Sequence, residues 1–146
     1  MNGLSSSQLA RLLSDDEHTK KTFRGIFNRL DIVISPLIDL NNDNIFVYLD
    51  RGHFVALIIG EVNYFIDPLG GGVPEDLQPT VDRWASPYRR EPDRAVQSTK
   101  SSLCGLFVYY YCVLLSGGVR RALPFDVDQR RNERILLDWY HDRRRN

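Results

Sequence analysis

The chain has 146 residues, of which 42% are hydrophobic and 26% charged, so it can bury one ordinary core and is not a disordered chain. Its net charge of zero conceals an asymmetry, because residues 1–82 carry 6 basic and 12 acidic side chains whereas residues 83–146 carry 13 basic and 7 acidic ones. The longest apolar run, residues 103–115, is shorter than the roughly 20 residues of a membrane span, and the first residues lack the basic leader and apolar core of a secretory signal. We therefore expect a single domain, residues 1–146, that is intracellular and not secreted.

In chain order, the hydrophobic pattern first predicts helix. Residues 6–30 carry apolar side chains at helical spacing after serines that can cap a first turn, so one or two helices are expected there. A short strand over residues 32–34 and a turn over residues 41–44, rich in Asn and Asp, come next. Three runs rich in β-branched and aromatic residues follow between turn signals and predict an antiparallel meander: 45–50, 53–60 and 62–70.

The second half of the chain predicts loop and then helix. Residues 70–100 contain four prolines and three consecutive glycines, so they are expected to be mostly loop, with a modest helix around residues 77–84. Residues 103–116 are the most apolar segment and predict a buried helix, and residues 126–143 predict an amphipathic helix on the outside. This order predicts an α+β fold with a small, mostly antiparallel central sheet flanked by helices, and with a cysteine at the start of the buried helix.

That cysteine is Cys104. A thiol at a helix amino terminus lies near partial positive charge and unpaired N–H groups, which favour the thiolate and raise its nucleophilicity. A lone cysteine is more often a small buried hydrophobe, and this is the interpretation of Cys112, in the middle of the same helix. The two cysteines have no histidines near them and match no zinc pattern.

Three further positions carry the groups that a reactive thiol needs. His53 opens a predicted strand, where its imidazole can act as a base. Asp67 ends the next strand, and a tight turn between the two strands would set it roughly opposite His53, so that its carboxylate orients the imidazole. Gln97 lies seven residues before Cys104, and its amide together with the Cys104 N–H can bind an oxyanion. Each residue alone also fits an ordinary role as a strand, turn or surface residue.

Taken together, this order of residues resembles the cysteine protease superfamily of the adenovirus protease (adenain) and the SUMO-specific proteases. The resemblance rests on GHFVALIIG, YFIDPLG and QSTKSSLCGLFVYYYC, which contain His53, Asp67, Gln97 and Cys104 in the order of the family. The start of the helix, CGLF, the PDR of residues 92–94 and the RRN of residues 130–132 are more similar to the adenovirus branch. The resemblance spans about residues 45–140.

The resemblance implies an adenain-like fold and a cysteine endopeptidase that requires no metal or organic cofactor. Cys104 would be the nucleophile, His53 the base, Asp67 the residue that orients it, and Gln97 an oxyanion donor. The substrate implied is an extended peptide, cut after a small residue, typically glycine. In the adenovirus branch such an enzyme matures viral precursor proteins, in the host nucleus or the virion, and DNA is an activating partner.

Three departures from the family pattern carry consequences. Phe54 follows the histidine where the family usually has tryptophan, and Asp67 matches the SUMO-specific branch, whereas adenain has glutamate. Ala95 follows the PDR where the adenovirus enzyme has the cysteine that ties an activating peptide by a disulfide. An activating peptide would therefore bind this chain non-covalently.

Two other functions compete with this interpretation. A deubiquitinating or deSUMOylating isopeptidase of the same superfamily would use identical chemistry on a folded partner. A non-enzymatic domain could instead bind DNA or another nucleic acid through the basic residues 83–146, since clustered arginines release the counterions of a polyanion.

Overall fold

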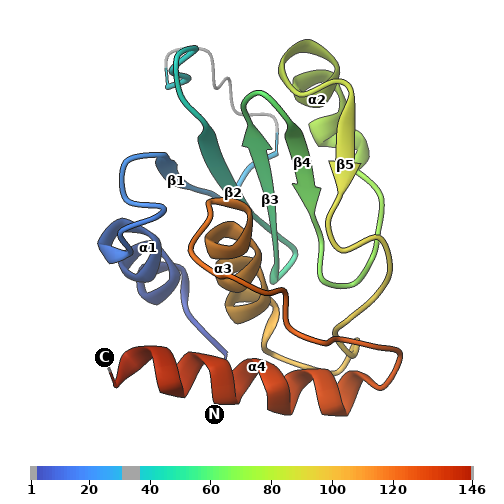
Figure 1. Ribbon diagram of the computed structural model, residues 1–146. Coiled ribbons are helices and arrows are strands. Elements are labelled where there is room, and N and C mark those ends of the chain that lie inside the picture. The colour runs from blue at the N-terminus through green and yellow to red at the C-terminus, as the bar shows by residue number, and fades with distance from the viewer. Residues whose placement is uncertain (1–2, 31–36, 146) are drawn as a thin grey trace.

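The computed structural model describes residues 3–30 and 37–145. Within them, five strands form one sheet in the order β1-β2-β3-β4-β5, with four helices packed around it (Figure 1). The predicted α+β fold is confirmed. The elements are α1 Ser6–Asp15, β1 Phe23–Phe27, β2 Asn44–Asp50, β3 His53–Ile59, β4 Asn63–Ile66, a 3-10 turn Glu75–Leu77, α2 Gln78–Trp84, β5 Tyr88–Arg90, α3 Cys104–Leu115 and α4 Gln129–Arg144.

The sheet is mixed rather than mostly antiparallel. Strands β2, β3 and β4 form the predicted antiparallel meander, but both edge strands, β1 and β5, pair in parallel with their neighbours. Parallel neighbours need a crossover connection, and between β4 and β5 the connection contains α2. The prediction of loop over Tyr88–Arg90 was wrong. These three polar residues show no apolar alternation and so carry no strand signal. They form a strand because the crossover places them beside β4, with which they pair.

The prediction of helix through residue 30 was also wrong beyond α1. Phe23–Phe27 forms β1, which pairs with β2. Gly25 within it has φ +136°, a backbone angle that no α-helix contains. The apolar side chains of this stretch that fitted a helical period are therefore spaced along a strand with an irregular register. The strand predicted over residues 32–34 lies outside the described residues.

Both faces of the sheet are covered, which explains why its central strands are apolar without alternation. Along β2, Ile45 and Val47 pack into a core with α1, α3 and α4, whereas Phe46 and Tyr48 point to the other face and pack against the segment that contains α2. Successive side chains of a strand point to opposite faces, so each run supplies both cores. No helix among the described residues is long and apolar enough to span a membrane.

Helix α3 packs against the central strands of the sheet, with α1 beside it and α4 running below it in the view of Figure 1. Every residue from Cys104 to Val113 is buried. Helix α1 covers it with Leu9 and Leu13, and α4 covers it with Leu136 and Tyr140. The helix that begins with Cys104 is thus held in position by contacts on all of its sides, not by a single apolar face.

A polar cluster joins the three helices of this layer at the ends of α1 and α4. The Asp16 carboxylate lies 2.6 Å from the Arg143 guanidinium and accepts a hydrogen bond of 3.0 Å from the Tyr109 hydroxyl. Burial alone would raise the pKa of Asp16, but hydrogen bonds from Arg143 and the His18 N–H lower it. Arg143, one of the arginines of the basic carboxyl-terminal run, therefore makes an internal ion pair.

Candidate active site

His53 and Asp67 meet at one end of the central strands. His53 is the first residue of β3, and Asp67 directly follows β4. The imidazole Nε2 and the carboxylate Oδ1 are 2.6 Å apart, and the two side chains are 22% and 11% exposed. The structure thus brings the predicted imidazole and carboxylate into direct contact.

The contact arises from a different register than the one predicted. Pairing between β3 and β4 begins at Ile58 and Tyr64, so the connection is wider than a tight turn. Ala56 pairs with Ile66, and continuing this register sets Val55, not His53, opposite Asp67. His53 lies two residues from Val55 on the same face of β3. The side chains of His53 and Asp67 span this offset and meet in a hydrogen bond.

The turn after β4 holds the Asp67 carboxylate in place. Its Oδ1 accepts a hydrogen bond from the Leu69 N–H at 3.0 Å, and its Oδ2 accepts one from the Gly71 N–H at 3.1 Å. Gly70 between them has φ +73°, and a Cβ there would lie 2.4 Å from the Ala95 nitrogen, so only glycine fits. Burial opposes the ionisation of Asp67, but its hydrogen bonds, with the one from His53 foremost, lower its pKa.

Cys104 is the first residue of α3, as predicted, and is 7% exposed. Burial alone would raise the pKa of its thiol. Hydrogen bonds from His53 and from the N–H groups of Phe54 and Gly105 outweigh burial and lower this pKa. Since Asp67 occupies Nε2 of the imidazole, Nδ1 is the ring nitrogen that remains for the thiol.

The imidazole shows the complementary shift. Burial opposes its protonation, but the hydrogen bonds with Asp67 and Cys104 prevail and raise the pKa of His53 to about 9. A lowered thiol pKa beside a raised imidazole pKa favours transfer of the proton from sulfur to nitrogen. Both shifts therefore favour the thiolate and imidazolium form of the pair, which is the activated form of a cysteine nucleophile.

Gln97 reaches the same site from the loop before α3. Its side chain is buried, at 2% exposed, and its Nε2 donates a hydrogen bond of 3.1 Å to the carbonyl oxygen of Ser101. An amide nitrogen carries two hydrogens, so the second remains for another acceptor. The Cys104 N–H belongs to the first turn of α3, where backbone donors have no intrahelical partner.

A cavity of about 470 Å³ contains the thiol, the imidazole and the Gln97 amide. Three larger hollows on the described part of the chain, of about 610, 750 and 790 Å³, are lined by no cysteine, and of these only the one of about 610 Å³ is lined by a histidine, His18. His53 and Cys104 thus line the same cavity. The lining residues are Gly3, Leu4, Arg51, Gly52, His53, Phe54, Leu69, Gln97, Thr99, Ser101, Ser102 and Cys104.

The remaining candidates lie elsewhere. Cys112 is completely buried in the middle of α3, where burial raises its thiol pKa to about 12. His141 is exposed on α4 and His18 follows α1, so neither lines the cavity. Among the described residues, no group of three His, Cys, Asp or Glu side chains is placed to hold a metal ion.

Sequence reasoning missed the backbone donors of the site. The N–H groups of Phe54 and Gly71 contact the thiol and the carboxylate respectively, and backbone groups carry no residue-specific signal. The only hint was the Asp-Pro-x-Gly order after β4, which is typical of a turn closed by the aspartate side chain.

Comparison of the chain with protein-family models and with curated proteins found no match in either case.

The first prediction concerns the reactivity of the two thiols. At pH 7 iodoacetamide should modify Cys104 much faster than Cys112, because only Cys104 has a lowered pKa and an opening to solvent. The rate at Cys104 should rise with pH to an inflection below the ordinary thiol value, as the thiolate forms. Peptide mapping by mass spectrometry gives both rates, and in urea the two thiols should react alike. Equal rates in the folded protein would show that Cys104 is not activated.

Proposed function

We propose that this protein is a cysteine endopeptidase in which Cys104, His53 and Asp67 form the catalytic triad and Gln97 is an oxyanion donor. One observation carries the proposal. The imidazole that is hydrogen-bonded at 2.6 Å to a buried carboxylate lines the same cavity as a thiol at the amino terminus of a buried helix, and it lowers the pKa of that thiol. Nucleophile, base and orienting carboxylate in this relation are the requirements for covalent attack on an acyl group.

In the first half of the reaction, the Cys104 thiolate attacks the scissile carbonyl carbon, and the carbonyl oxygen becomes an oxyanion. The free hydrogen of Gln97 Nε2 and the Cys104 N–H donate to it. The C–N bond then breaks, and protonated His53 gives its proton to the leaving amine. A thioester on Cys104 and a neutral imidazole remain.

In the second half, His53 takes a proton from a water molecule, which attacks the thioester carbonyl. The carbon–sulfur bond breaks, the acid product leaves, and the thiolate and imidazolium are restored. Asp67 keeps the imidazole in one orientation throughout and stabilises its protonated form. The cycle consumes one water and one peptide bond and needs no cofactor.

The resemblance to the adenain superfamily supports a substrate class. It implies an extended peptide cut after a small residue, typically glycine, and the closer likeness to the adenovirus branch supports the processing of viral or virus-like precursor proteins. The α+β fold with a buried helix that begins at the cysteine is consistent with this assignment.

The partners proposed for the enzyme follow the same reasoning. Only two cysteines are present, and both are buried, so an activating peptide would bind without a disulfide. DNA is a second proposed partner, through the basic carboxyl-terminal half. Part of that positive charge is already paired, since Arg143 bonds to Asp16 and Arg131 to Asp126.

The second prediction tests the substrate class. Fluorogenic peptides that differ only in the residue before the cleaved bond should be hydrolysed with glycine there and at least about tenfold more slowly with leucine, because a narrow site rejects a branched side chain. Conjugates of ubiquitin-like proteins serve as the second panel. Turnover of those conjugates without any cleavage of the glycine peptides would favour the isopeptidase, and no turnover of either panel would contradict the proposal.

A further inference from the structure

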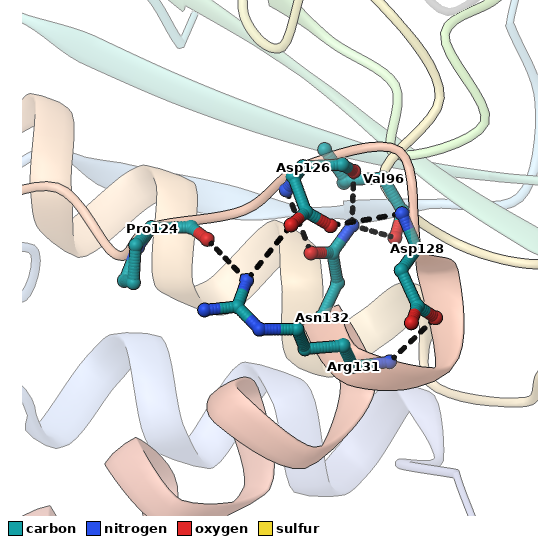
Figure 2. A network of polar contacts seen from close by, with 6 residues as sticks. All are labelled: Val96, Pro124, Asp126, Asp128, Arg131 and Asn132. Atoms are coloured by element: carbon teal, nitrogen blue, oxygen red, sulfur yellow. Dashed lines mark hydrogen bonds and ion pairs between the residues drawn. The ribbon is translucent and has the colours of Figure 1, made fainter.

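One buried side chain of helix α4, that of Asn132, contacts the backbone next to the candidate site. Asn132 is completely buried, and its amide oxygen and both of its amide hydrogens have partners. Its Oδ1 accepts from the Asp126 N–H at 2.8 Å, and its Nδ2 donates to the Asp126 carbonyl oxygen at 2.7 Å. The second hydrogen of Nδ2 goes to the carbonyl oxygen of Val96, at 3.1 Å, which lies 36 residues away in the sequence. Figure 2 shows this network.

Val96 immediately precedes Gln97, so the bond from Asn132 holds the peptide group that joins the two residues. The carbonyl of that group accepts from Asn132, and its N–H, which belongs to Gln97, donates to the Pro68 oxygen at 3.2 Å. The Val96 N–H donates to the same Pro68 oxygen at 3.0 Å. Because the peptide group is planar, hydrogen bonds at both its C=O and its N–H hold its orientation relative to the neighbouring segments.

The orientation of this peptide group sets the direction of the Gln97 side chain. Gln97 Nε2 makes one described hydrogen bond, to Ser101, and its Oε1 is buried without a partner. The hydrogen bonds of the Gln97 side chain thus fix its direction only in part. The remaining constraint comes from the backbone before it. Pro68, the other anchor, follows Asp67 directly, so the same peptide group also joins the oxyanion donor to the turn that carries the carboxylate.

We propose that Asn132 is a positioning residue for the oxyanion donor: it fixes the Val96–Gln97 peptide group and thereby aims the Gln97 amide at the substrate carbonyl. This inference rests on the proposed function and assigns α4 a part in it. A displacement of about 1 Å at a catalytic group can lower a rate a hundredfold, so one buried hydrogen bond at this place is sufficient to matter.

The test compares Asn132→Leu, which removes the amide at similar volume, with Asn132→Ala, which leaves more room. Each should lower kcat by about 10- to 100-fold, less than the 100- to 1,000-fold expected when an oxyanion donor is removed, with KM within about twofold. A peptide aldehyde, whose hemithioacetal adduct with Cys104 places its oxygen where the oxyanion would form, should also bind more weakly. Alkylation of Cys104 by iodoacetamide should be unchanged, because the thiol and the imidazole are untouched.

Arg131→Ala is the matched control. Arg131 bonds to the Pro124 oxygen and the Asp126 carboxylate in the same network but makes no described bond to Val96, so this variant should keep its kcat. Peptide mapping after brief alkylation counts the folded molecules in each sample, because only these modify Cys104 much faster than Cys112, so partial unfolding does not mimic a fall in kcat. In a Gln97→Ala background, Asn132→Leu should have no further effect on kcat.

Two results would overturn the inference while leaving the proposed function intact. One is an unchanged kcat in Asn132→Ala with a wild-type enzyme that cleaves peptides. The other is an additive loss of kcat in the double variant with Gln97→Ala. If the wild-type protein itself cleaves no peptide, the proposed function fails, and the inference fails with it.

Discussion

Replacement of Cys104 by alanine is expected to reduce peptide hydrolysis at least about a thousandfold, because in the proposed mechanism this residue supplies the nucleophile and the imidazole alone cannot form the thioester. The fold should survive, since alanine fits the first turn of α3 and removes one sulfur atom from the edge of the cavity. Steady-state hydrolysis of the glycine peptide gives the rate, and circular dichroism checks the helices.

Cys112→Ala is the matched control, because it makes the same substitution in the same helix at a site that is completely buried and away from the cavity. It should lower the thermal midpoint and leave turnover per folded molecule unchanged. DNA binding, measured by fluorescence anisotropy, should be the same in both variants and in the wild type. Undiminished hydrolysis by Cys104→Ala would contradict the proposal that the protein is a cysteine endopeptidase.

Replacement of Asp67 by asparagine should lower kcat by about 100- to 10,000-fold, the range expected when the group that orients a catalytic imidazole loses its charge. Asp67 and Cys104 together raise the pKa of His53 to about 9 against the effect of burial. Without the charge of Asp67, one of these two contributions is weakened and the pKa of His53 falls. The imidazolium and its thiolate partner are then less favoured.

The pH profile distinguishes this mechanism from simple loss of structure. In the wild type, the rate should fall as the pH rises through about 9, where His53 loses its proton, and should fall on the acid side as the thiolate is protonated. In Asp67→Asn, the alkaline limb should move to lower pH. Asp76→Asn, at an exposed position on the turn before α2, should keep the wild-type profile. An unmoved alkaline limb in Asp67→Asn would mean that His53 is not coupled to Asp67.

The central part of the fold could be predicted from the sequence because its signals are local. The turn residues between β2, β3 and β4 and the long apolar stretch of α3 mark their elements directly, and the predicted fold class is confirmed. The edge strands could not be predicted in this way. β5 is the polar Tyr88–Arg90, and it becomes a strand only because the crossover through α2 places it beside β4.

The same distinction applies to the site. His53, Asp67 and Cys104 stand at the ends of strongly patterned elements, so their order along the chain was informative, and the structure brings them together. The link from Asn132 to Val96 connects residues 36 positions apart through a backbone carbonyl, and no spacing rule addresses such a contact. The prediction of which strand residue falls opposite Asp67 was wrong because the width of the connection between β3 and β4 depends on packing.

The burial of α3 from Cys104 to Val113 has a mechanical consequence. Cys104 belongs to a closely packed helix, which cannot shift without disturbing several close-packed neighbours at once. His53 and Gln97, by contrast, lie at a strand terminus and in a loop. In the proposed enzyme, adjustment of the site to an incoming peptide is therefore expected from these two residues rather than from the sulfur atom.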